Sequence, residues 1–187
     1  MNYASLLMTL LIASACNNPA QQTAAPIYYD VAGYVKTQID ALAKAKPTVQ
    51  KRARMGRKTE QLTTQTVNWP RELELFSQAD INKPALRSSY AIARPDSLTY
   101  LYTLKPSEKN LTVRRLRVQL DSATRQPRRI EATLASQNPL YTSERQILLE
   151  SGPVKQQGWG VRHYQIRGFQ HLAVAAKNTF EVEGTVQ

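Results

Sequence analysis

The feature that most constrains the fold of this 187-residue chain is an alternation of apolar and polar residues that begins after Ser88. Alternate residues of an extended strand point to the same side, so each alternating run predicts a strand with one buried face. Short segments rich in Pro, Gly, Asn, Asp and Ser separate the runs, which predicts tight turns and antiparallel neighbours. The positions predicted to point inward include Leu116, Val118, Leu120, Ile130 and Leu134.

The first half of the chain predicts two helices. Apolar residues recur at the spacing of an amphipathic helix between Asp30 and Lys46, with Asp30 as N-cap and Pro47 as a stop. A second, shorter helix is predicted after Asn68, with Pro70 in its first turn. We therefore expect helices only in the part of the chain that precedes the alternating region.

Between these helices, residues 48–55 and 57–64 flank Gly56 and alternate like the strands of a hairpin. The predicted fold class is therefore α+β. We expect a predominantly antiparallel meander sheet of about six to eight strands, with the two helices of the N-terminal half packed on one face.

The N-terminus has the pattern of an export signal. The first 15 residues carry no charged side chain, and their apolar run ends in three small residues just before Cys16. The run is shorter than the roughly 20 residues that cross a bilayer, but it fits a secretory signal and resembles the lipobox of bacterial lipoproteins. We expect a lipoprotein signal peptide over residues 1–15, with lipid on Cys16 as membrane anchor. The alternatives are an ordinary signal peptide cleaved elsewhere and a buried N-terminal helix.

Residues 16–26 are predicted to be a flexible tether, because they contain no large apolar side chain, and residues 27–187 a single α+β domain. Surface-exported lipoproteins of the Bacteroidota often carry an acidic cluster after the lipidated cysteine, and this chain has none there. By that resemblance, we expect a protein anchored in the bacterial outer membrane and facing the periplasm.

The charge balance predicts an anionic partner. The chain has 25 Lys and Arg against 14 Asp and Glu, a net charge of +11, and such a surface attracts anions. Within an envelope these are lipid headgroups, lipopolysaccharide phosphates or acidic groups of the cell wall, whereas export argues against nucleic acid. Arg52 and Arg54 are two residues apart on one predicted strand, and so are Arg115 and Arg117. Each pair is therefore predicted to present its charges on one sheet face. The alternative is a merely solvated basic surface.

The sequence offers little for catalysis. His163 and His171 are predicted to lie about 26 Å apart on one extended strand, too far to share a metal. Glu181 and Glu183 are predicted to form an outward, solvated strand face. The chain contains no nucleophile elbow, no glycine-rich phosphate loop and no cysteine inside the predicted domain. We therefore expect no enzyme, no cofactor and no metal site.

Three segments together resemble an uncharacterised group of Bacteroidota lipoproteins of similar length. They are Tyr28, Tyr29, Asp30, Gly33 and Tyr34, then residues 80–84 with the sequence DINKP, and residues 140–143 with the sequence LYTS. The resemblance covers most of the chain after Cys16. It implies the envelope location and no particular activity.

Two functional hypotheses remain open. The first is binding of a lipid or a lipid-bearing chain, by analogy of fold class with periplasmic lipoprotein carriers. The second is a structural or interaction protein that binds an anionic envelope component through its basic face. An apolar cavity between sheet and helices would favour the first, and a filled core with an exposed basic patch the second. The aromatic residues that would line such a cavity or fill such a core are Tyr28, Tyr29, Tyr34, Tyr90, Tyr100, Tyr102, Tyr141, Tyr164 and Trp159.

Overall fold

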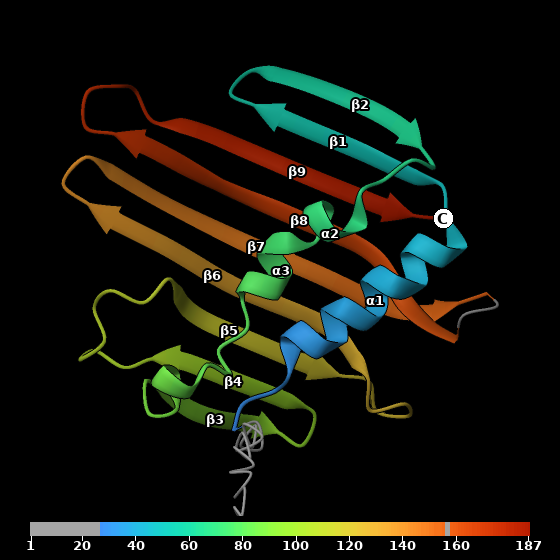
Figure 1. The fold of residues 1–187 in the computed structure, drawn as a ribbon, viewed down its shortest axis with the longest axis horizontal. Coiled ribbons are helices and arrows are strands. Elements are labelled where there is room, and N and C mark those ends of the chain that lie inside the picture. Colours follow the sequence, from blue (N-terminus) through green and yellow to red (C-terminus); the bar gives the residue numbers. More distant parts are fainter. Residues whose placement is uncertain (1–26, 156–157) are drawn as a thin grey trace, which may run out of the picture.

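The alternating runs of the sequence form the strands of one nine-stranded antiparallel sheet, with the helices on one of its faces (Figure 1). The computed structural model describes residues 27–155 and 158–187. The predicted signal peptide, Cys16 and the tether lie outside the described residues. The helical elements are α1 (Val31–Ala45), α2 (Trp69–Glu72), α3 (Glu74–Gln78) and the short 3-10 turn η1 (Pro84–Leu86). The strands are β1 (Val49–Met55), β2 (Lys58–Thr64), β3 (Tyr90–Asp96), β4 (Thr99–Leu104), β5 (Val113–Leu120), β6 (Pro127–Asn138), β7 (Tyr141–Val154), β8 (Gly158–Leu172) and β9 (Asn178–Val186).

The strand order across the sheet is β2-β1-β9-β8-β7-β6-β5-β4-β3. The second half of the chain is therefore a meander from β3 to β9, as predicted, and the N-terminal hairpin extends the same sheet because β1 pairs with β9. The sheet has nine strands, one more than the upper limit of the predicted six to eight, and the additional strand is β3. Strands account for 53% of the described residues and helices for 17%, so the fold is mainly β and only loosely α+β.

The sequence pattern missed β3, an edge strand. Its alternation is interrupted by Pro95, and its pairing with β4 shifts register between Ala93 and Asp96. Proline lacks a backbone N–H and is tolerated at a sheet edge, where one side of the strand has no partner. The edge position therefore explains why this strand forms without a clear strand pattern.

Side-chain caps fix where the helices begin. Asp30 accepts a hydrogen bond from the Gly33 backbone N at 2.8 Å, and Asn68 caps the start of α2 in the same way. At its C-terminus, α1 ends on Lys46 in the left-handed conformation, at φ 47°. The predicted second helix is divided into α2 and α3 at Leu73, whose backbone at φ −101° and ψ 11° departs from the helical geometry.

One apolar cluster fills the space between the helices and the sheet. The five strand residues predicted to point inward are all buried, with exposed fractions between 0% and 6%. From the helices, Val31, Val35 and Phe76 pack against them with no exposed surface. Every buried polar side-chain atom of the described residues has a hydrogen-bond partner. The interior is therefore packed with side chains at the place where a lipid carrier would need a cavity.

Most of the aromatic residues belong to this core. Tyr28 packs edge-on against Tyr90 and Tyr102, with ring centroids 5.8 and 5.3 Å apart, and its hydroxyl donates to the carbonyl oxygens of Leu86 and Arg87. These contacts attach the start of the described chain to β3 and β4.

The buried and half-buried tyrosines predict that the fold is sensitive to alkali. Burial raises the pKa of Tyr29, Tyr34 and Tyr90 to about 12, and it also raises the pKa of Tyr102. These pKa values lie above the ordinary tyrosine pKa of about 10, so the folded state favours the protonated phenols. The resulting contribution to the free energy of unfolding is complete below about pH 10 and is lost as the pH rises through about 12.

We therefore expect the melting temperature to fall steeply between about pH 10 and pH 12. The ultraviolet absorbance of tyrosinate should rise in the same cooperative step as the loss of near-ultraviolet circular dichroism. A gradual rise near the ordinary tyrosine pKa, with the native circular dichroism retained, would contradict the burial of these phenols.

Candidate functional site: an arginine hollow on the open face

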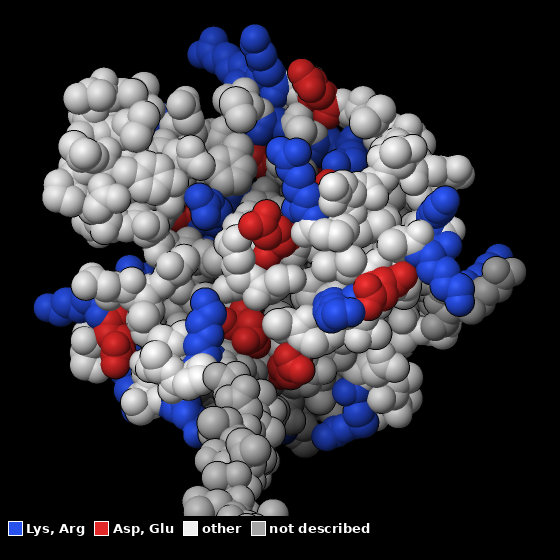
Figure 2. All heavy atoms as spheres, viewed as in Figure 1, with Lys and Arg blue, Asp and Glu red and all other residues white. Residues whose placement is uncertain are grey.

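The two faces of the sheet differ in what covers them. On the helix face, cations and carboxylates are interspersed over the surface (Figure 2). The opposite face has no helix over it in the described chain, and we call it the open face (Figure 1). Strand residues that alternate with the buried ones point to this open face, and most of them are polar or charged.

The strand register arranges these residues in rows that run across the sheet. In one row, Arg115 of β5 pairs with Thr133 of β6, Thr133 with Gln146 of β7, and Gln146 with Arg167 of β8. The neighbouring row contains Arg117, Glu131, Leu148 and Gln165 on the same four strands. Cross-strand neighbours of this kind are close enough for their side chains to interact.

These rows enclose a hollow of about 420 Å³, which we call the arginine hollow. Four arginines and a single carboxylate, that of Glu131, are among its lining residues. The lining comprises Arg115, Arg117, Arg129, Glu131, Ala132, Thr133, Gln146, Ile147, Leu148, Gln165 and Arg167.

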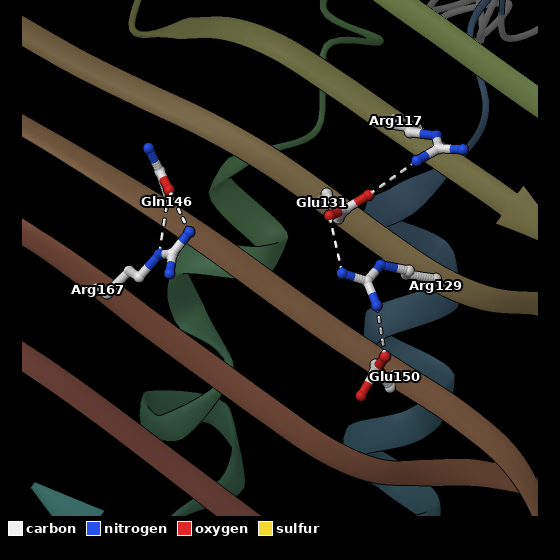
Figure 3. A network of polar contacts seen from close by, with 6 residues as sticks. All are labelled: Arg117, Arg129, Glu131, Gln146, Glu150 and Arg167. Atoms are coloured by element: carbon white, nitrogen blue, oxygen red, sulfur yellow. Dashed lines mark hydrogen bonds and ion pairs between the residues drawn. The ribbon is translucent and has the colours of Figure 1, made fainter.

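Part of the arginine charge is neutralised within the hollow (Figure 3). Glu131 accepts hydrogen bonds from Arg117 at 3.4 Å and from Arg129 at 3.0 Å, and Arg129 also donates to Glu150 at 2.7 Å. Burial by itself raises the pKa of Glu131, but the hydrogen bond and charge of Arg129, with the charges of Arg117 and Arg115, outweigh it and lower the pKa overall. Glu131 is therefore ionised and holds two guanidinium groups in place.

The two outer arginines keep their charge. Arg167 donates from Nε and Nη2 to the Oε1 atom of Gln146, at 3.1 and 2.9 Å, and this partner is neutral (Figure 3). Arg115 is exposed, and its side chain makes no ion pair or hydrogen bond with any described residue. The lining holds four guanidinium groups and one carboxylate, Glu150 pairs with Arg129, and Glu144 accepts a hydrogen bond from Gln146, so the hollow with these two neighbours has a net charge of +1.

The four arginines predicted from the sequence all lie on the open face, but they do not line one hollow. Arg52 and Arg54 lie on β1, five strand positions from β5 and two from β8, which is about 24 and about 10 Å at a spacing of about 4.8 Å. Arg54 and Arg167 both pair in register with Glu181 and line a neighbouring hollow of about 300 Å³. The guanidinium groups of Arg52 and Arg54 pair with Glu183 at 2.6 Å and with Glu181 at 3.1 Å. The arginine hollow instead combines Arg115 and Arg117 with two arginines that the sequence reasoning missed, Arg129 and Arg167.

A second concave region lies where the C-terminal end of α1 meets the ends of β7, β8 and β9. It is a groove of about 840 Å³ with Lys44, Lys155 and Arg162 among its lining residues. Two apolar residues of this groove, Leu42 and Val161, expose only 3% and 1% of their surface. The other apolar residues of the lining are half-buried or exposed, and they are Ala41, Ala45, Pro47, Pro153, Val154 and Val186. The groove therefore combines basic and apolar surface, and it is larger than the arginine hollow.

His163 and His171 lie on the open face of β8 but do not assemble a metal site. No group of three or more His, Cys, Asp or Glu side chains within residues 27–155 and 158–187 is arranged to hold a metal ion. His163 instead lies 3.5 Å from the hydroxyl of Thr185 on β9, as a strand residue beside its neighbour.

Among the described residues, no helix combines the length and apolar character needed to cross a membrane. Comparison of the whole chain with protein-family models, with curated proteins and with solved structures yields no match.

Proposed function

We propose that this protein is a membrane-anchored, periplasm-facing envelope lipoprotein that binds an anionic ligand in the arginine hollow. The observation that carries the binding part is the row from Arg115 to Arg167, in which two un-neutralised guanidinium groups flank a polar floor. Guanidinium groups bind phosphates and carboxylates through paired, charge-assisted hydrogen bonds. The anchoring part depends on the signal and Cys16 of the sequence.

The lining favours a hydrophilic polyanion. Thr133, Gln146 and Gln165 offer donors and acceptors that suit hydroxyl groups. The backbone positions of Arg115 and Arg167 are three strand spacings apart, about 14 Å, so their flexible side chains can reach two anionic groups of one ligand. A phosphorylated or carboxylated sugar chain has both properties.

The packing of the core supports this proposal over a lipid carrier. The apolar side chains between helices and sheet are buried against one another, and the largest of them have no exposed surface. An acyl chain bound there would have to displace side chains from a close-packed interior, which costs free energy.

Binding of inositol hexakisphosphate tests the hollow. We expect the full chain carrying Cys16→Ser, which cannot be acylated at that position, to bind this probe at low ionic strength in a calorimetric titration. Replacing both Arg115 and Arg167 with Gln should raise the dissociation constant at least about tenfold, because hydrogen bonds to charged groups contribute about 1.5 to 3 kcal/mol each and exposure to solvent reduces that value. The affinity should also fall as salt is added.

The matched control removes the same charge from the same face. Replacing Arg52 and Arg54 with Gln should change the dissociation constant by less than about threefold, because these guanidinium groups already pair with carboxylates and neither of them lines the arginine hollow. An equal loss of affinity in the two double variants would refute the hollow as the binding site and leave only the overall charge.

A further inference from the structure

Three hairpin turns meet at one end of the sheet, and we call this surface the hairpin edge (residues 55–58, 138–141 and 172–178). They connect β1 to β2, β6 to β7, and β8 to β9. Backbone hydrogen bonds join them, from the Ala173 N to the Leu140 O and from the Gly56 N to the Thr179 O, both at 3.0 Å. The three turns therefore form a continuous surface.

This surface gathers exposed apolar side chains. Among the described residues, seven large hydrophobic residues are exposed, and four of the seven lie on the hairpin edge. They are Met55 at 70%, Leu140 at 74%, Leu172 at 50% and Val174 at 96% exposure. In Figure 2 the lobe at the upper left, where β6 to β9 end, shows mainly uncharged side chains on the side that faces the viewer. Exposed apolar side chains gathered on one surface are typical of sites that meet a membrane or a partner.

Cations accompany the apolar side chains. Arg57 and Lys58 belong to the first turn and Lys177 to the third, and none of them forms an ion pair with a described carboxylate. Lys177 lies 3.6 Å above the ring of Phe169. The fourth turn at this end, between β4 and β5, adds Lys105 and Lys109 against Glu108, so it preserves the positive sign.

We infer that the hairpin edge docks on the surface of an anionic bilayer. Leu140, Val174 and Met55 enter the boundary between headgroups and acyl chains, and the cations meet lipid phosphates. This combination favours a lipid surface over a folded protein partner, because the apolar groups stand on separate turn tips and the charges beside them have one sign.

The inference rests on the proposed anchorage for its membrane partner. The eleven residue steps from Cys16 to Ile27 span at most about 40 Å when fully extended. Eight strand spacings give the sheet a width of about 38 Å. The chain enters the described structure beside β3 and β4 (Figure 1), and a tether of this length allows the hairpin edge to reach the bilayer.

Vesicle sedimentation tests the docking surface independently of acylation. The full chain carrying Cys16→Ser should bind phosphatidylglycerol vesicles at low salt and ignore phosphatidylcholine vesicles. Replacing Arg57, Lys58 and Lys177 with Gln should reduce the partition coefficient on the order of a hundredfold, since each cation near an anionic surface contributes about 1 kcal/mol. Replacing Leu140 and Val174 with Ser should also reduce it by at least about tenfold.

Matched variants separate the hairpin edge from general charge and apolarity. Lys44, Arg71 and Lys83 are exposed elsewhere, and their replacement with Gln should leave at least about a third of the binding. Ile92 and Leu62, exposed at 53% and 59%, serve as the apolar control. Equal losses in edge and control variants, or no binding of the parent chain to anionic vesicles, would overturn the inference. The variant with both Arg115 and Arg167 replaced by Gln should still bind vesicles. The vesicle experiment therefore tests the hairpin edge separately from ligand binding in the arginine hollow.

Discussion

Replacing Tyr164 with Ala should lower the free energy of unfolding by about 3 to 5 kcal/mol, as for other large buried aromatic side chains. Tyr164 has no exposed surface, and its hydroxyl donates to the Oε1 atom of Glu72 on α2 at 2.6 Å. Its ring lies over Gly184, directly opposite on β9, where an added Cβ would overlap the ring atoms. Glu72 in turn pairs with Lys51 of β1 at 2.7 Å. Tyr164 and Glu72 together therefore join β8, β9 and β1 to α2.

Phe169 provides the control because it is an aromatic residue on the same strand with the opposite parity. Replacing it with Ala should cost less than about 1 kcal/mol, since a half-buried side chain on the open face leaves no closed cavity. Tyr164→Phe should lower the free energy of unfolding by an intermediate amount. It loses only the hydrogen bond to a carboxylate, which contributes about 1.5 to 3 kcal/mol. Urea denaturation gives all three values. Similar midpoint shifts for Tyr164→Ala and Phe169→Ala would contradict the described packing.

The buried face of the sheet was predictable because burial imposes a local rule. A strand that buries one face must place apolar residues at alternate positions, and Leu116, Val118 and Leu120 follow that rule within a few residues of one another. The helix boundaries were similarly local, since Asp30 caps α1 through its own Gly33. Features set by neighbours in sequence were therefore available from the sequence.

The polar face was not predictable in the same way, because its contacts depend on register between distant strands. Arg52 and its partner Glu183 are 131 residues apart in the chain. Parity indicates that both side chains point outward, but only the pairing of β1 with β9 shows that they neutralise each other. The predicted arginines were thus on the correct face, whereas their distribution between ion pairs and an open hollow depended on the topology.

Arg129 and Arg167 illustrate the same limit. Arg129 stands among Arg128 and Glu131 in a charged run, and Arg167 precedes Gly168, so neither has a local pattern that marks a site. The register brings them toward Arg117 and Gln146 across the sheet. A cation count predicts an anionic partner in general, but it does not tell which cations keep their charge available.

Replacing Cys16 with Ser should abolish acylation completely and release the protein from the membrane in high salt. Cys16 is the only cysteine of the chain and directly follows the small residues that end the apolar run. Several acyl chains anchor a protein firmly, since each buried methylene contributes about 0.8 kcal/mol. Labelling of cells with radioactive palmitate, followed by fractionation, measures both effects. Undiminished label in the variant would refute the lipoprotein proposal.

Salt should separate the proposed lipid anchor from the proposed docking of the hairpin edge. The acylated wild-type protein should stay in the membrane fraction at any ionic strength, because burial of acyl chains is not screened by ions. The Cys16→Ser variant, if the hairpin edge binds anionic lipid, should remain partly membrane-associated at low salt and become soluble near physiological ionic strength, where charges are screened beyond about 8 Å. Asn17→Ser is the matched control next to the cysteine and should keep full label and salt-resistant membrane association. A Cys16→Ser variant that resists extraction by salt would show that something other than the acylated cysteine holds the protein on the membrane.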